Sequence, residues 1–337
     1  MRASDFDIYK QYRIATLNRV FVANVNTLYS ALKININRIN ASRATNKQSL
    51  INSLMTQYNN NLNALRAKLI ADVANVTAFK PTFAITAGTV KRKSALLIGI
   101  NYVGTPYELS GCIEDSNNMK ALLTSHGFTQ FTMLNDTTST KPTKAAILAA
   151  FKSLVTSASA GDIVLFHFSG HGSYTFDKSG DETDGRDEMI ISSDLQGVLD
   201  DDFKAILSAN MKEGVTLVGL FDSCHSGTMF DLKYNYLNSE NYDKYTENDK
   251  ASECSGNVLM ISGCMDSQTS SEAEVNGKTQ GAITWCFIQS INGAGADGVS
   301  WRQLLKGMRD VLKTNGFDQI PQISTDSFYD IDSNVFL

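Results

Sequence analysis

Two segments of the sequence contain the residue types of a thiol nucleophile and its base. Residues 221–227 read F-D-S-C-H-S-G, and residues 168–172 read F-S-G-H-G. In hydrolases that use cysteine, a histidine takes the thiol proton and the thiolate attacks a carbonyl carbon. A cysteine in such a segment can also be a metal ligand or an inert thiol of the core. The rest of the chain has to decide among these three roles for Cys224.

The choice of the base follows from the apolar runs that precede the two segments. Residues 162–168 lead to His171 and residues 215–221 lead to Cys224, and both runs have the composition of buried strands. Neighbouring side chains at a strand end point to opposite sides, which disfavours the adjacent His225 as the base. We therefore expect His171, 53 residues upstream, to serve Cys224. The backbone N–H groups of Gly172 and Cys224 are candidates for an oxyanion site, because glycine allows a sharp turn that exposes them.

The number and spacing of the cysteines exclude two other kinds of chemistry. The five cysteines lie at positions 112, 224, 254, 264 and 286, and no two of them form a C-x-x-C pair. An odd, scattered set predicts neither a disulfide framework nor a zinc cluster. We interpret the cysteines other than Cys224 as small apolar residues of the core.

The elements that must position these residues alternate between strand and helix from residue 94 onward. We predict strands at 94–101, 130–134, 162–168, 215–222 and 257–263, and helices at 117–128, 144–154, 201–210, 281–291 and 299–312. This alternation is typical of an α/β fold with a mostly parallel sheet and helices on both faces. Active-site residues in such sheets lie beyond the carboxyl ends of the strands.

The first 90 residues have a different character. An apolar stripe at spacings of three and four predicts helix over 12–75, with a turn at A-S-R-A-T-N. Residues 1–93 contain 14 Lys and Arg against 3 Asp and Glu, whereas residues 94–337 contain 16 against 32. Two interpretations stay open. In the first, the charges of each segment are exposed to water on its own surface; in the second, the basic arm docks on the acidic body or on another anion. The charged start and the lack of a membrane-length apolar run favour an intracellular, cytoplasmic protein.

Several motifs resemble the metacaspases, which are caspase-like cysteine peptidases. They are S-G-H-G, D-S-C-H-S-G, S-G-C-M-D-S-Q-T-S-S-E-A, G-A-I-T-W-C-F-I and the segment from S-W-R-Q-L-L-K to Q-I-P-Q-I-S. The resemblance covers residues 94–337 and implies a caspase-like fold with a large catalytic region before a small one, as in type I members. Residues 1–90 lack the Pro/Gln-rich or zinc-finger prodomain of many such members. We therefore divide the chain into a helical segment at 1–90, a large region at 91–253 and a small region at 254–337.

Substrate specificity follows partly from the residues and partly from the resemblance. Asp222 lies two residues before Cys224, so both side chains share one strand face, where a carboxylate would attract a cationic substrate residue. The resemblance implies a pocket for Arg or Lys formed by Cys112, Asp115, Ser169 and Asp222, with Asp266 as a weaker candidate. From the residues alone, Asp115 can instead be a helix N-cap.

Acidic residues cluster at D-E-T-D-G-R-D-E, residues 181–188, and at D-D-D, residues 200–202. These clusters lack the pattern of an EF-hand, and a solvated acidic loop is the default interpretation. The resemblance implies a calcium site formed by Asp187, Asp200, Asp201 and Asp231, with Asp201/Asp202 as an alternative register.

The sequence therefore predicts a calcium-dependent endopeptidase that cleaves protein or peptide substrates after Arg or Lys. We expect a monomeric zymogen with autocatalytic cleavage in 232–253, after Lys233, Lys244 or Lys250, and with the basic run at 91–93 as a second candidate site. We expect neither a nucleic-acid partner nor a membrane span. A scaffold without catalysis, acting through its N-terminal helical arm, is the alternative from another class. Cleavage after Asp or Asn is a third reading, which Asp222 disfavours.

Overall fold

The computed structural model describes residues 3–78, 90–176, 186–224, 227–236, 246–247, 254–263, 272–275, 278–293, 298–327, 331 and 334–335. Contacts between Cα atoms divide the chain into two units, Met1–Thr82 and Phe83–Leu337. No helix in these ranges combines the length and the apolar character that crossing a membrane requires.

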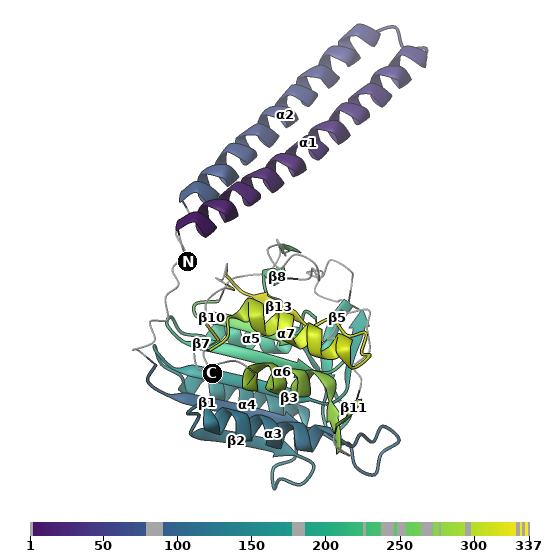
Figure 1. Ribbon diagram of the computed structural model, residues 1–337. Coiled ribbons are helices and arrows are strands. Elements are labelled where there is room, and N and C mark those ends of the chain that lie inside the picture. The colour runs from purple at the N-terminus through teal and green to yellow at the C-terminus, as the bar shows by residue number, and fades with distance from the viewer. Residues whose placement is uncertain are drawn as a thin grey trace. The chain divides into compact units, whose positions relative to one another are not determined.

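The N-terminal unit is a pair of long helices that lie side by side, α1 (Ala3–Ala41) and α2 (Lys47–Ala78) (Figure 1). Residues 42–46 connect them, inside the segment that the sequence predicted to be a turn. The predicted helical N-terminal segment is thus confirmed.

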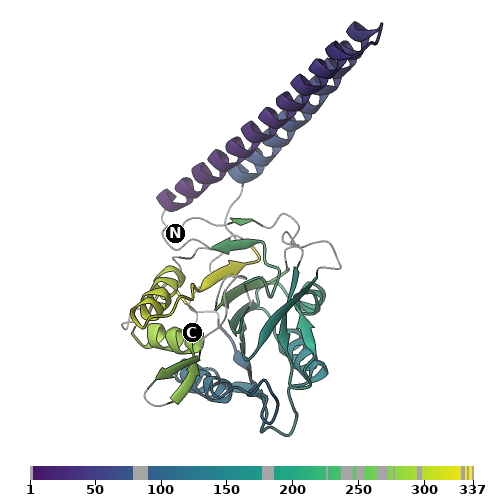
Figure 2. The same cartoon turned by 90° about the vertical axis from the view of Figure 1, so that its right-hand side faces the viewer.

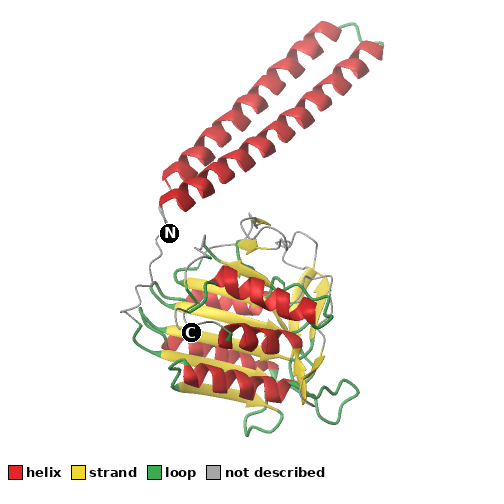
Figure 3. Cartoon of the chain, viewed as in Figure 1, coloured by secondary structure: helices red, strands yellow, loops and turns green. Residues whose placement is uncertain are grey.

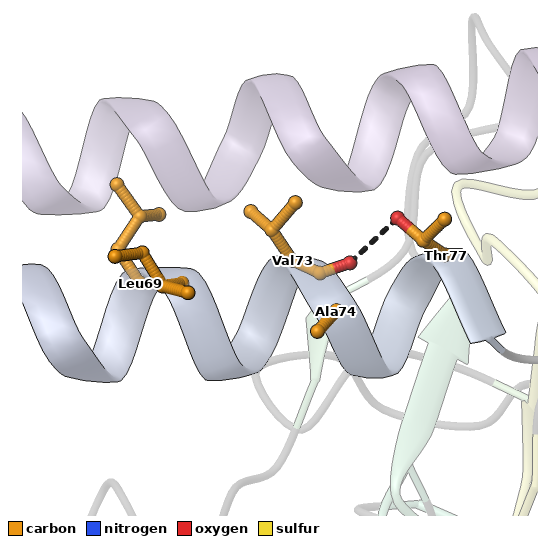
Figure 4. A pocket seen from close by; sticks show the side chains of 5 residues that line it. Leu69, Val73, Ala74 and Thr77 are labelled. Atoms are coloured by element: carbon orange, nitrogen blue, oxygen red, sulfur yellow. Dashed lines mark hydrogen bonds between the residues drawn. The ribbon is translucent and has the colours of Figure 1, made fainter.

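Two helices alone enclose little of their apolar surface. Among the described side chains of this unit, only Val76 is buried. Figure 4 shows a shallow apolar hollow on α2 lined by Leu69, Ile70, Val73, Ala74 and Thr77, where the Thr77 hydroxyl donates to the Val73 carbonyl at 2.7 Å. Apolar packing therefore contributes less to this unit than to the second one.

An eight-stranded sheet forms the centre of the second unit (Figure 3). Its strand order is β2-β1-β3-β7-β10-β13-β8-β9, in which the first five strands run parallel and the last three are antiparallel to their neighbours. The strands are β1 (Lys93–Gly99), β2 (Gln130–Asn135), β3 (Ile163–Ser169), β7 (Thr216–Asp222), β8 (Tyr234–Tyr236), β9 (Thr246–Glu247), β10 (Asn257–Ser262) and β13 (Gln322–Thr325). All five parallel strands were predicted, and the mostly parallel sheet is confirmed.

Helices cover both faces of this sheet, as predicted (Figures 1 and 2). One face carries α3 (Cys112–Ser125), α6 (Ala282–Asn292) and α7 (Trp301–Thr314), and the other carries α4 (Lys144–Ser157) and α5 (Asp200–Asn210). The helix α3 begins five residues earlier than predicted, which places Asp115 inside its first turn and Gly111 at the N-cap. The N-cap interpretation of Asp115 is therefore wrong.

Five phenylalanine rings form the centre of the core on the α4/α5 face. They are fully buried, with ring centroids 4.9–6.3 Å apart: Phe151, Phe166, Phe203, Phe221 and Phe230. Burying a phenylalanine contributes roughly 1.5–3 kcal/mol to stability. Since Phe230 lies six residues after Cys224, this cluster also anchors the chain that follows Cys224.

Several short strands escaped sequence analysis. A three-stranded antiparallel sheet consists of β4 (Gly172–Phe176), β5 (Arg186–Ile191) and β6 (Gly197–Leu199). A two-stranded antiparallel sheet consists of β11 (Glu272–Val275) and β12 (Lys278–Gly281), and β12 leads directly into α6. These strands are short and carry no long apolar run, which is the signal that predicted the parallel strands.

Candidate active site

The sheet brings the two candidate catalytic segments to the same edge. The strands β3 and β7 are parallel neighbours, and their last residues, Ser169 and Asp222, are directly paired. His171 and Cys224 each follow two residues later. A Cβ atom on Gly172 would lie 1.9 Å from the Cys224 carbonyl oxygen and 3.2 Å from its amide nitrogen. Only glycine therefore allows the backbone after His171 to approach Cys224 this closely, and the two residues named for the oxyanion site lie against each other.

Two tyrosines of the loop after β1 hold His171. The Nε2 atom of His171 lies 2.8 Å from the Tyr107 carbonyl oxygen, and the Tyr102 hydroxyl accepts the His171 backbone N–H at 2.9 Å. The Tyr102 ring lies against the imidazole, with centroids 4.8 Å apart. A carbonyl oxygen can only accept, so Nε2 carries a proton and Nδ1 is the basic nitrogen of the neutral ring.

Sequence analysis did not name these tyrosines. The sequence feature that could have indicated them is their position after the first parallel strand, at the edge where the other strands also end. Tyr102 has a left-handed backbone conformation, with φ of 52°, and its hydroxyl donates to the Ile191 carbonyl at 2.7 Å. Burial raises the pKa of Tyr102 above its usual value. The hydroxyl therefore stays protonated and keeps this donor role.

The other described cysteines lie in environments that suit inert thiols. Burial raises the pKa of Cys254 to about 11, and burial together with the Asp222 charge raises the pKa of Cys286 well above its usual value. Cys112 is buried in the first turn of α3. Cys224 is half-buried and follows a strand end. Because a thiolate has to reach a substrate, Cys224 is the described cysteine whose position suits a nucleophile.

The residues predicted to form a basic-residue pocket come together behind the strand ends. Asp115 is fully buried and accepts a hydrogen bond of 2.7 Å from the Ser169 hydroxyl. Asp222 is 3% exposed and ends β7. Cys112 lies one helical turn before Asp115 in α3. The structure thus brings Asp115 to Ser169 directly and places Cys112 on the same helix turn.

Two further residues that sequence analysis missed contact these carboxylates. The Gly281 N–H donates to both Asp115 carboxylate oxygens, at 3.0 and 2.9 Å. The Thr284 N–H donates to Asp222 Oδ2 at 2.7 Å. Both amides belong to the start of α6, which the sequence predicted as a helix without linking it to the pocket. Backbone amides carry no side-chain signal, so only the packed structure identifies them.

Three of the four predicted metal ligands converge. Asp187, in β5, and Asp200 and Asp201, in the first turn of α5, each offer a carboxylate oxygen, and these oxygens lie within 4.8 Å of one another. Two oxygens bound to one calcium ion at about 2.4 Å lie at most about 5 Å apart. Asp187 and Asp200 are buried. This group of hard oxygen donors therefore fits Ca²⁺.

The other two aspartates that the sequence analysis named as candidate calcium ligands have different contacts. Asp202 accepts from the Leu199 N–H at 3.1 Å and pairs with Lys144 at 2.8 Å, which favours the Asp200/Asp201 register. Asp231 is buried outside the group of three oxygens. Its backbone has a φ of 46°, and its carbonyl oxygen accepts from Lys204 Nζ at 2.8 Å.

A hydrogen-bonded path connects the carboxylate group to the chain after Cys224. The Asp200 carboxylate accepts from the Glu188 N–H at 2.7 Å, and the Glu188 carboxylate accepts from the Thr228 hydroxyl at 2.6 Å. The Asp231 N–H in turn donates to the Thr228 carbonyl at 2.7 Å. The acidic residues and the segment that follows Cys224 are therefore parts of one network.

Several sequence-based candidates lie outside the described residues: His225, Cys264, Asp266, Lys244, Lys250 and residues 181–185. His167, which is among the described residues, is fully buried in β3.

Comparisons with known proteins find similar sequences. A family model described as metacaspase, peptidase C14 domain, matches residues 93–233. Metacaspase-1 of Kluyveromyces lactis is 36% identical over 298 residues, which cover 72% of this chain and 68% of that protein. Metacaspase-1A of Aspergillus fumigatus is 35% identical over 295 residues, which cover 72% of this chain and 70% of that protein.

A solved structure is similar as well. The crystal structure of a protein from Geobacter sulfurreducens matches with a TM-score of 0.54 and 27% sequence identity. The match covers 73% of this chain and 98% of that chain.

Proposed function

Because the chain belongs to the metacaspases, a family of cysteine-type peptidases, we propose that it cleaves protein or peptide substrates after Arg or Lys. The observation that carries this proposal is the pair of buried carboxylates, Asp115 and Asp222, beside the strand end that leads to Cys224. The family membership confirms the enzyme class predicted from the sequence. The residue preference and the roles of individual side chains are our inference.

In the proposed mechanism His171 and Cys224 act as a catalytic pair. His171 takes the thiol proton at Nδ1, while the Tyr107 carbonyl holds the Nε2 side of the ring. The thiolate attacks the scissile carbonyl carbon, and the N–H groups of Gly172 and Cys224 stabilise the oxyanion. His171 then protonates the leaving amine. Water, deprotonated by the same histidine, releases the acyl group from the sulfur.

The pocket explains the proposed preference. A cationic side chain that enters beside Asp115 and Asp222 gains charge-assisted hydrogen bonds in a site from which water is largely excluded. An acidic side chain would meet two negative charges instead. The same pair of carboxylates disfavours cleavage after Asp, because like charges placed together cost several kcal/mol.

We also propose that Asp187, Asp200 and Asp201 hold a regulatory calcium ion, with Asp231 as a further ligand from the chain after Cys224. Bound calcium would neutralise the carboxylates and bridge their segments. Magnesium should substitute poorly, because it demands a tight octahedron. Calcium binding that orders these aspartates would also order the segment after Cys224, because the hydrogen bonds of Glu188 and Thr228 connect the two.

The double substitution Asp200→Ala/Asp201→Ala tests the calcium proposal. We expect the unmodified protein to be nearly inactive in excess EGTA and to gain activity at calcium concentrations of about 0.1–1 mM. The double variant should bind no calcium in isothermal titration and should show no calcium-dependent gain, because two of the proposed ligands are missing. Its Cys224 should still react with iodoacetamide. Asp194→Ala, outside the group, is the matched control. Full activity in EGTA would contradict the proposal.

We further expect self-processing between the two catalytic regions. Lys233 directly precedes strand β8, whose neighbours in the sheet hold it, and the Arg92 carbonyl oxygen accepts from the Ile163 N–H at 2.9 Å. Cleavage at either residue would require the bound backbone to leave its place. The Lys91 N–H likewise donates to the Gly161 carbonyl at 3.0 Å, so Lys244 and Lys250 remain the expected sites. Mass spectrometry of the active protein should find new termini after at least one of them, and Cys224→Ala should show none. Full peptide turnover without any new terminus would contradict self-processing.

A cleavage profile tests the function as a whole. The substrates are peptides with Arg, Lys, Asp or Asn before a fluorescent leaving amine. We expect turnover of the Arg and Lys peptides and no measurable turnover of the Asp and Asn peptides. The alternative is a scaffold that acts through the N-terminal helical arm. Absence of turnover with every peptide, in calcium and with Cys224 shown to be reduced, would favour that scaffold.

A further inference from the structure

We propose that the first turn of α6 is a specificity element, in which Gly281 and Thr284 are positioning residues for the two pocket carboxylates. Asp115 lies in α3 and Asp222 ends β7, whereas α6 comes from a later part of the chain. The pocket would therefore be complete only when α3, β7 and α6 are packed together. This inference rests on the proposed preference for Arg or Lys and assigns part of it to residues outside the predicted pocket.

The hydrogen bonds at the start of α6 support this assignment. Gly281 is the N-cap residue of α6, and its N–H donates to both oxygens of Asp115. The Thr284 N–H, one turn into the helix, donates to Asp222 Oδ2. Amides at a helix N-terminus carry a partial positive charge and stabilise carboxylates. They hold both acidic groups in place and favour their anionic form, which attracts a cationic substrate.

Gly281 has a steric role that no other residue can fill. Its φ of −67° and ψ of 133° are open to any amino acid, so the backbone conformation does not require glycine. A Cβ atom at this position, however, would lie 2.1 Å from Asp222 Oδ2 and 2.8 Å from Asp115 Oδ2. Even alanine would therefore displace the carboxylates or move α6 away from them.

A buried histidine fixes the other side of the same turn. The Thr284 hydroxyl lies 3.0 Å from His167 Nε2, and both residues are fully buried. Burial lowers the pKa of His167 to about 3, so this imidazole is neutral at physiological pH. The contact ties α6 to β3 without adding a positive charge next to the pocket.

Gly281→Ala tests the assignment, with Gly293→Ala as the matched control at the opposite end of α6. Gly293 has a φ of −77°, and among the described residues a Cβ there would meet the Gln289 and Ser290 carbonyl oxygens, at 3.2 and 3.9 Å. The substrates are two peptides that differ in Arg or citrulline, its neutral isostere, before the cleaved bond. We expect the ratio of kcat/KM for Arg over citrulline to fall by about tenfold or more in Gly281→Ala, the loss typical of a charge-assisted hydrogen bond. Gly293→Ala should keep the ratio.

The outcomes separate this inference from the proposed function. A wild-type protein that cleaves both peptides equally would overturn the Arg preference and this inference with it. A wild-type preference for Arg that Gly281→Ala retains would overturn this inference alone. The rate of Cys224 alkylation by iodoacetamide should be the same in wild type and Gly281→Ala, because the expected change is confined to the pocket.

A second pair of variants keeps the test decisive if Gly281→Ala does not fold. Thr284→Val removes the hydroxyl that contacts His167 and preserves the side-chain volume, whereas Thr284→Ser keeps the hydroxyl. We expect Thr284→Val to raise KM for the Arg peptide by about tenfold with a smaller change in kcat, since the turn that holds Asp222 loses its anchor. Thr284→Ser should restore KM. Equal KM values in both variants and wild type would contradict the role of this turn.

Discussion

Replacing Cys224 with alanine is expected to abolish peptide hydrolysis, with a loss of at least about 10⁴-fold in kcat. The thiolate is the proposed attacking atom, and removal of a nucleophile that acts together with its base leaves only the contribution of binding and the oxyanion site. Initial rates with an Arg peptide in calcium measure the loss. The variant should fold normally, because Cys224 is half-buried and its side chain is small.

His171→Ala should lower kcat by about 10³-fold, which is within the range for loss of a general base. His225→Ala is the informative comparison, since it removes the histidine that is adjacent to Cys224 in the sequence. We expect that variant to keep the chemistry. A folded but inactive His225→Ala together with an active His171→Ala would show that the base has been assigned to the wrong residue.

Asp222→Ala is expected to lower kcat/KM for Arg and Lys peptides mainly through a higher KM. Loss of one partner from a buried, hydrogen-bonded charge pair costs about 2–5 kcal/mol, which corresponds to about 30- to 4,000-fold. Much of this cost comes from the substrate cation that is left poorly paired. Steady-state kinetics with Arg, Lys and citrulline peptides measure it.

Asp222→Asn separates the charge of this residue from its packing. The amide oxygen of Asn can still accept the Thr284 N–H, so the start of α6 should stay in place. We expect Asn to lose most of the preference for Arg over citrulline while the protein unfolds at nearly the wild-type temperature. Efficient cleavage after Asp by the unmodified protein would contradict the assignment of this pocket.

The proposed calcium ligands show how far local sequence can define a site. Asp187, Asp200, Asp201 and Asp202 are all acidic residues in polar segments, and the sequence left two registers for the second pair. The structure separates them because the first turn of α5 gives each position a different direction. Asp200 and Asp201 face Asp187, whereas Asp202 caps the helix and pairs with Lys144.

The sequence by itself determined the class of fold and the candidate catalytic pair. Apolar runs of strand length, separated by helical patterns, predicted the five parallel strands. A strand that is buried on both faces is apolar along its whole length, and this composition can be recognised in the local sequence. The S-G-H-G and D-S-C-H-S-G segments follow two of these strands, so topology alone predicted that His171 and Cys224 share an edge. The metacaspase resemblance drawn from the same motifs is confirmed by the family comparison.

Tertiary structure alone decided what surrounds those residues. The Tyr107 carbonyl on His171 and the Gly281 and Thr284 amides on the pocket carboxylates are backbone groups, and every residue except proline has both kinds. Their roles come from contacts between segments far apart in the chain, such as the 166 residues that separate Asp115 from Gly281. A side-chain pattern has no means of encoding such a contact. It appears only when α3, β7 and α6 pack together at the same edge of the sheet.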